Sequence, residues 1–168
     1  YMGKPNVAIL SGRGTSSNQV GEIWHYFDQQ IEYPVTMLDT EYFDGVDLDT
    51  YDVLILPSGY YNSRIDSSRF ADVKEWVTNG GKLIAVQYAN SFLAGKDGFA
   101  LTHKNGDSSE PEQEELLETY SDQQREYISN FNSGSIYEIT MDNTHPLAYG
   151  YDEEYFSLKL DADAYAYL

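Results

Sequence analysis

The chain has 168 residues, of which 28 are acidic and 10 are lysine or arginine, so its formal net charge is −18. A surface this acidic repels phosphate backbones and anionic lipid headgroups, which excludes nucleic acids and acidic membranes as favourable partners. No apolar run approaches the roughly 18 residues of a membrane-spanning helix. The sequence contains no cysteine, so disulfides, thiolate metal sites and a cysteine nucleophile are excluded. The length predicts one domain, 1–168, that can bury a core without covalent or metal cross-links.

The first two-thirds of the chain alternates strand and helix signals. Three- and four-residue spacing of apolar side chains predicts helices at about 18–29 and 67–78, and a further helix from residue 89. Short apolar runs predict four strands, at residues 6–10, 34–38, 51–57 and 82–87. Apolar strands in this order predict an α/β fold, a doubly wound and mainly parallel sheet with helices on both faces.

The connections and the last third of the chain are more polar. Residues 39–50 contain five acidic residues and are interpreted as a solvated connection. Residues 104–133 are predicted to form an acidic, partly helical and exposed insertion. Alternating residues then predict strands at 135–140 and 155–160. Since no further helix follows, a last layer of the sheet is expected to be missing or supplied differently, and the chain is interpreted as a fragment of a larger protein.

The candidate site lies in the turns that follow the strands, because ligands of open parallel sheets bind at the carboxyl ends. The first turn contains Gly12, Arg13 and Gly14, but Ser17 stands where a dinucleotide fingerprint has its third glycine, which favours a structural turn. The turn at 85–91 has the pattern of a nucleophile elbow, in which the strained, projecting residue would be Tyr88. A phenol is a poor nucleophile at neutral pH, because almost all of it is protonated there.

Three segments carry a resemblance to a known superfamily: residues 52–59, the helix end at 79–81, and the strand at 82–85 that leads into the elbow. Together they resemble the class I glutamine amidotransferase-like superfamily, with its PfpI-type peptidases and deglycases. The resemblance implies a flavodoxin-like fold, oxyanion-hole amides in the turn after the third strand, and cysteine at the elbow. Tyr88 stands at the position of the family's cysteine, and Asn90 stands at the glycine two residues later. Ser58 replaces the first glycine of the oxyanion turn, and Gly59 matches the second. Without the cysteine, no catalytic residues are expected.

A narrower resemblance rests on residues 21–28, 56–61 and 142–150. These segments are similar to the amidotransferase-like domain that follows the catalytic domain in bacterial zinc carboxypeptidase-like proteins. The resemblance implies an exported, periplasmic or extracellular parent protein whose zinc lies in a separate upstream peptidase domain. It predicts that this chain is a non-catalytic accessory domain that binds another domain or a ligand.

Two alternatives use other residues. The first is a hydrolase in which Ser58 or Ser91 works with His145 or His103, although neither serine lies in a Gly-x-Ser-x-Gly motif. The second is a stand-alone sugar- or peptide-binding module with an aromatic floor at the carboxyl edge. The floor would consist of Tyr60, Tyr61 and Tyr88, and the full predicted ligand-binding set is Arg13, Ser58, Gly59, Tyr60, Tyr61, Tyr88 and Asn90.

No metal site is predicted. Glu22 and His25 are spaced so that a helix would bring both side chains to one face. The histidines are nevertheless scattered along the chain without a recognised zinc-ligand spacing, so a structural role is favoured for His25.

Overall fold

The computed structural model describes residues 3–104, 134–159 and 164–166. The chain divides into two compact units, one comprising the chain up to Thr102 and the other running from His103 to Ala166. The first contains the sheet and helices that position the candidate site. That both units belong to one domain, 1–168, stays a prediction.

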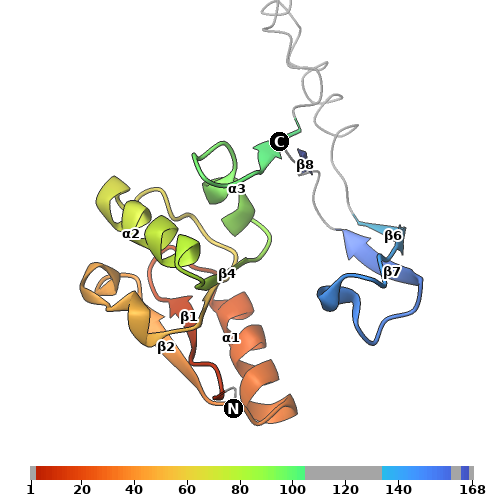
Figure 1. Cartoon of the computed structure of the whole chain (residues 1–168), viewed down its shortest axis with the longest axis horizontal. Coiled ribbons are helices and arrows are strands. Elements are labelled where there is room, and N and C mark those ends of the chain that lie inside the picture. Colours follow the sequence, from red (N-terminus) through yellow and green to blue (C-terminus); the bar gives the residue numbers. More distant parts are fainter. Residues whose placement is uncertain (1–2, 105–133, 160–163, 167–168) are drawn as a thin grey trace, which may run out of the picture. The chain divides into compact units, whose positions relative to one another are not determined.

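The first unit is built on a parallel sheet of four strands in the order β2-β1-β3-β4 (Figure 1). The strands are β1 (Val7–Ser11), β2 (Val35–Asp39), β3 (Val53–Leu56) and β4 (Lys82–Ala85). The predicted strands are confirmed, and their ends differ from the prediction by at most two residues. β1 and β3 are central and almost fully buried, as expected for strands covered on both faces.

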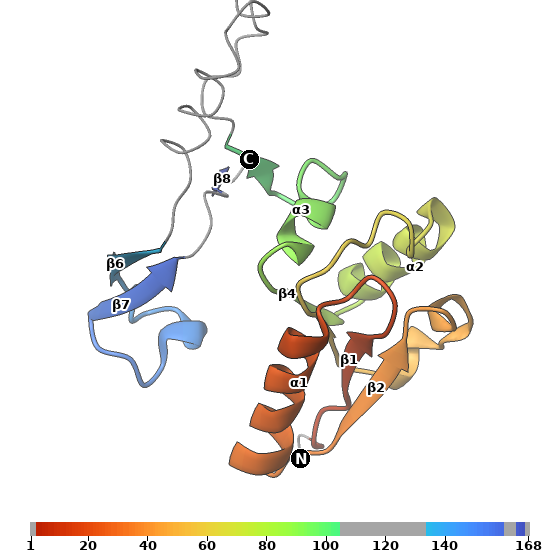
Figure 2. The ribbon, with the colours of Figure 1, turned by 180° about the vertical axis from the view of Figure 1, so that it is seen from behind.

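Helices cover both faces of this sheet, as predicted (Figures 1 and 2). α1 (Ser17–His25) continues into a π-helical turn, η1 (Tyr26–Gln30), and contributes Ile23 and Phe27 to the core on one face. The opposite face carries α2 (Ser67–Thr78) and the short α3 (Ala89–Leu93). α1 begins where the Ser16 side chain accepts a hydrogen bond from the Gln19 backbone N–H. Asp66 caps α2 in the same way.

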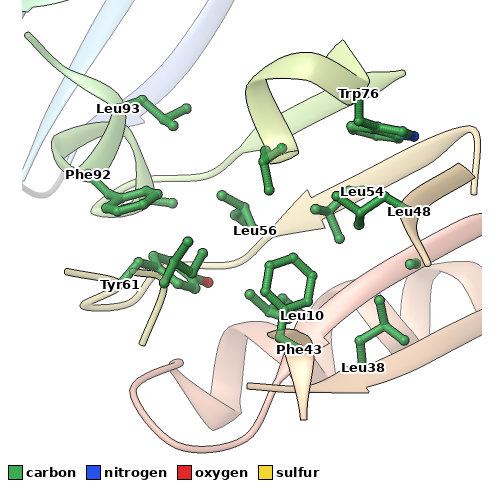
Figure 3. Packing of buried hydrophobic residues seen from close by; sticks show 14 residues of the cluster. Leu10, Leu38, Phe43, Leu48, Leu54, Leu56, Tyr61, Trp76, Phe92 and Leu93 are labelled. Carbon is green, nitrogen blue, oxygen red and sulfur yellow. The ribbon is translucent and has the colours of Figure 1, made fainter. Parts of the chain in front are cut away.

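The larger core lies between the sheet and α2 with α3 (Figure 3). Leu10, Leu54 and Leu56 come from the central strands, and Trp76 and Phe92 come from the helices. The Trp76 Nε1 group donates a hydrogen bond to the Tyr51 carbonyl at 3.1 Å, so its polar atom keeps a partner although the ring is buried.

The connection between β2 and β3 corrects one sequence-based interpretation. It forms two short 3₁₀ helices, η2 (Phe43–Gly45) and η3 (Leu48–Thr50), whose Phe43 and Leu48 are buried in the larger core. The acidic residues of this segment are exposed, but the solvated interpretation was wrong for these two side chains. Two apolar anchors among many acids give no helical periodicity, which is why the sequence pattern concealed them.

Arg69 of α2 fastens this connection to the helix. Its Nη2 donates to the Val46 carbonyl at 2.8 Å, and its guanidinium lies 4.4 Å from the centroid of the Phe43 ring. Nη1 is 3.5 Å from the Asp72 carboxylate one turn further along α2. Arg69 is buried, so these contacts form in surroundings where an unpaired charge would be unfavourable.

The second unit contains an antiparallel hairpin of β6 (Ser135–Thr140) and β7 (Glu154–Lys159). A 3₁₀ helix, η5 (Pro146–Ala148), lies between these strands. β5 (Thr102–His103) pairs with β8 (Tyr165–Ala166). The hairpin agrees with the two predicted strands, whereas the predicted insertion at 104–133 lies, apart from Lys104, outside the described residues.

Replacing Arg69 by methionine should lower the free energy of unfolding by about 2 kcal/mol, because the Val46 carbonyl loses its charged donor. Lys74→Met is the matched control on the same helix, since Lys74 makes an exposed ion pair with Asp97 and should matter less. Urea denaturation followed by tryptophan fluorescence measures both. Equal losses in the two variants would contradict the role given to Arg69.

Candidate functional site

Two turns at the carboxyl edge of the sheet are joined by their backbones. Thr15 in the turn after β1 pairs with Gly59 in the turn after β3 as an isolated antiparallel bridge. The Ser16 N–H donates to the Ser58 carbonyl at 2.7 Å, and the Tyr60 N–H donates to the Gly14 carbonyl at 2.8 Å. The first and third turns therefore lie together at one edge, as the parallel topology predicts.

Gly59 is required by this close approach. A Cβ atom on Gly59 would lie 2.5 Å from the Gly14 carbonyl oxygen and 3.1 Å from the Thr15 Cα. Both are backbone atoms, so a side chain could be accommodated only by moving one turn away from the other. Gly14 has a φ of +93°, a conformation that glycine adopts at little cost.

Two amides of the turn after β3, those of Ser58 and Tyr60, already have acceptors within the chain. The Ser58 N–H donates to the side-chain oxygen of Gln19, which is buried in α1, and the Tyr60 N–H is bound to Gly14. An oxyanion hole needs backbone donors that point at an empty position. The Ser58 amide could serve a substrate only if the Gln19 side chain moved.

The turn after β4 is sharp, but its strained residue is not the predicted one. Gln87 has a φ of +50°, whereas Tyr88 has a φ of −61° and a ψ of −14° and already belongs to the start of α3. The chain reverses at Gln87 because the Val86 N–H still bonds to Leu56 of β3, while the Asn90 N–H bonds back to the Gln87 carbonyl. The prediction that Tyr88 is the strained residue of an elbow is wrong.

Two of the three predicted edge tyrosines meet in a stacked pair. The rings of Tyr60 and Tyr88 are nearly parallel, at 18°, with their centroids 6.3 Å apart. They come from the turns after β3 and β4, two neighbouring strands. The Tyr60 side chain is 76% exposed and Tyr88 is 45% exposed, so the pair is open to solvent.

Tyr61 does not belong to this pair. It is fully buried, its hydroxyl donates to the Pro57 carbonyl at 2.6 Å, and its ring lies 5.7 Å from that of Phe92 (Figure 3). Burial raises the pKa of the Tyr61 phenol well above its usual value. The predicted three-membered aromatic floor is therefore wrong for Tyr61. Tyr60 and Tyr61 are neighbours in a turn outside the strands, so no alternation in the sequence separates the exposed ring from the buried one.

The remaining predicted residues occupy the same unit at different depths. Arg13 is exposed in the turn after β1, and its carbonyl accepts a hydrogen bond from the Thr40 hydroxyl at 2.8 Å. Ser58 is buried, and Asn90 and Ser91 are partly buried in α3.

The histidines proposed for a hydrolase have local roles. His145 Nδ1 accepts a hydrogen bond from the Leu147 N–H at 3.2 Å and so caps η5. His103 lies against Tyr165, with 5.0 Å between the ring centroids. Both belong to the second unit, while Ser58 and Ser91 belong to the first. Among the residues that the structure describes, no hydrogen bond joins Ser58 to a histidine.

Arg64 is a residue of this edge that the sequence reasoning missed. Its side chain lies against Gly14, with Cγ 3.1 Å and Nε 3.5 Å from the position that a Gly14 Cβ would occupy. Its Nε is buried without a hydrogen-bond partner, and within the described ranges Arg64 makes no ion pair. It follows the polar residues Asn62 and Ser63, where no periodicity indicates partial burial. The only hint in the sequence is that Arg64 lies close to Tyr60 in the same turn, four residues further along the chain.

A cavity of about 290 Å³ lies at the opposite, amino-terminal edge of the sheet, between η3 and α2. It is lined by acidic residues together with Arg69 and Trp76, which already serve the fold as described above. Within the described residues, no acidic and histidine side chains are grouped so as to hold a metal ion. In the same part of the chain, no helix combines the length and apolar character needed to cross a membrane.

Comparison of the chain with models of protein families, with curated proteins and with solved structures finds no match. The resemblance to amidotransferase-like proteins is therefore carried by the residues of this chain alone and stays a prediction.

Gly59→Ala should lower the free energy of unfolding by about 1–3 kcal/mol, because the new methyl group collides with the backbone of Gly14 and Thr15. Gly21→Ala is the matched control: Gly21 lies in α1 with open space around it, and alanine should raise the stability by up to about 1 kcal/mol. Thermal unfolding followed by circular dichroism measures both. An unchanged melting temperature for Gly59→Ala would contradict the close approach of the two turns.

Proposed function

We propose that this chain is a flavodoxin-like, non-catalytic domain of the class I glutamine amidotransferase type that binds a ligand or a neighbouring domain through its carboxyl edge. The observation that carries the proposal is the exposed stack of Tyr60 and Tyr88. Two neighbouring parallel strands deliver these rings to the edge where open α/β sheets bind their ligands.

The strand order supports the fold assignment. A flavodoxin-like sheet has the order 2-1-3-4-5, and β2-β1-β3-β4 follows its first four positions. The positive φ of Gln87 after β4 adds a sharp strand-to-helix turn one residue before Tyr88, the position matched to the superfamily's nucleophile.

Three observations support a non-catalytic role. The sequence has no cysteine, the Ser58 amide is bound to Gln19, and Tyr88 adopts ordinary helical backbone angles. A catalytic elbow combines an activated nucleophile with open amide donors, whereas a phenol is a poor nucleophile at neutral pH and the Ser58 amide is already bound.

The chemistry of the tyrosine pair supports binding. A phenol ring presents an apolar face and a polar tip, which suits the faces of sugar rings and the planar groups of peptides. In the proposed setting, the chain is an accessory domain of an exported zinc carboxypeptidase-like protein. Its partner would be an upstream peptidase domain that carries the zinc, or a small sugar or peptide ligand.

Tyr60→Ala and Tyr88→Ala should each weaken ligand binding about tenfold or more, because each removes one of the two stacked rings. Tyr42→Ala is the matched control, since Tyr42 is 74% exposed but follows the outer strand β2. A thermal-shift screen of sugars and short peptides finds the ligand, and calorimetry with each variant measures its affinity. Equal losses in all three variants, or no ligand at all, would count against a binding site at this pair.

The isolated chain should show no glutaminase, peptidase or glyoxalase turnover. The hydrolase alternative predicts turnover that Ser58→Ala or Ser91→Ala abolishes. Turnover lost in any of the variants Tyr88→Phe, Ser58→Ala or Ser91→Ala would overturn the non-catalytic proposal.

A further inference from the structure

We infer that Arg64 makes the carboxyl-edge site selective for small ligands that carry a carboxylate beside a flat apolar face. The inference rests on the proposed function, because it takes the Tyr60 and Tyr88 pair as the surface on which the flat face lies. The inference adds to that function a requirement that the ligand be negatively charged.

Arg64 is a partly buried basic residue of the first unit that makes no ion pair with a described residue. Basic side chains are few, since the chain has 10 lysines and arginines against 28 acidic residues. Arg69 and Lys74 each pair with an aspartate, whereas Arg64 makes no ion pair within the described residues and differs from the equally unpaired Arg13 and Lys82 in being partly buried. Its buried Nε also has no hydrogen-bond partner. A guanidinium placed in this way has unused capacity for an anion.

The position of Arg64 is fixed by the turn that holds it. The N–H groups of Arg64 and Ile65 both donate to the Tyr61 carbonyl at 2.9 Å, and Ile65 is buried in the core. Gly14 leaves the space for the side chain, since a Cβ there would lie 3.1 Å from Arg64 Cγ. The backbone of Arg64 is therefore held in place before any ligand arrives and the stem of its side chain lies against Gly14, which lowers the entropy lost on binding.

The acidic groups beside this edge are engaged in the fold. Asp66, two residues after Arg64, accepts a hydrogen bond from the Arg69 N–H at 2.7 Å and caps α2. Asp39 at the end of β2 accepts from the Glu41 N–H at 2.8 Å and lies against Gly12. Arg13 adds a second, exposed guanidinium in the adjoining turn.

The chemistry of the neighbouring groups specifies the ligand class. A Cβ atom on Gly14 would lie 3.5 Å from Arg64 Nε and 3.2 Å from the Tyr60 carbonyl oxygen. Arg64 therefore lies near the backbone of Tyr60. A guanidinium binds a carboxylate through two parallel hydrogen bonds, which a neutral hydroxyl or amide does not provide. The rings of Tyr60 and Tyr88 offer the apolar face. A uronic acid and the C-terminal residue of a short peptide both combine these two features.

Calorimetry with the full chain tests the inference with two matched ligand pairs. One pair is a disaccharide that ends in glucuronate and its glucose counterpart, and the other is an N-acetylated tyrosyl dipeptide as the free acid and as the amide. The acid of at least one pair should bind about tenfold more tightly than its neutral partner. The two pairs distinguish the saccharide from the peptide source of the carboxylate.

Substitutions then locate the charge. Arg64→Gln should remove the preference for the acid while leaving the affinity for the neutral partner unchanged. Arg64→Lys should keep part of the preference for the acid, because lysine supplies the positive charge but not the planar guanidinium that forms two parallel hydrogen bonds. Lys82→Gln, at an exposed lysine of β4, makes the same charge change and should leave the preference intact.

Equal affinities within both pairs, or a preference that survives Arg64→Gln, would overturn the inference but leave binding by the tyrosine pair standing. Binding by none of the four ligands would also overturn it, and the wider sugar and peptide screen would then decide the proposed function separately. If Arg64→Gln melts at a clearly lower temperature, Arg64→Lys and the wild-type comparison of acid with neutral ligand still decide the outcome.

Discussion

The candidate site depends on one backbone junction, the bridge between Thr15 and Gly59. It holds the turn after β1 against the turn after β3 and thereby fixes Tyr60, whose N–H is bound to Gly14. Gln19 strengthens the junction from α1 by accepting the Ser58 N–H. Hydrogen bonds of this kind are individually modest, but together they hold the two turns in one arrangement, and groups held in this way would lose little entropy on binding a ligand.

The two faces of the sheet are covered unequally. One row of side chains crosses all four strands on the α1 face, with Ile9 paired to Met37 and Ile55, and Ile55 paired to Ile84. The two central residues are buried, while Met37 is 41% and Ile84 is 47% exposed, because α1 covers only the middle of the sheet. The opposite face is packed by the connection after β2 as well as by α2 and α3. That packing includes Tyr61 and Phe92, and so it anchors the segments that follow β3 and β4.

Local patterns predicted the framework, since strand runs such as β1 and caps such as Asp66 act through near neighbours in sequence. The α/β class, the parallel sheet and the meeting of Tyr60 with Tyr88 followed from that framework and its topology. The failures came from contacts between residues distant in sequence. Burial of Phe43 under Arg69 and the contact of Arg64 with Gly14 join segments that no periodicity relates. Nothing in the sequence distinguished the buried Tyr61 from the exposed Tyr60 beside it in the same turn.

The strain at Gln87 lies in a chain that has no cysteine to place at such a turn. A residue other than glycine with φ near +50° costs on the order of 1–3 kcal/mol, and such strain persists where the surrounding structure imposes it. Here the surroundings are the bond from Val86 to β3 and the first turn of α3. By reversing the chain within one residue, Gln87 allows Tyr88 to begin the helix with its ring against Tyr60. The strained turn therefore places an aromatic pair at the edge, a role that binding requires and that nucleophilic catalysis does not.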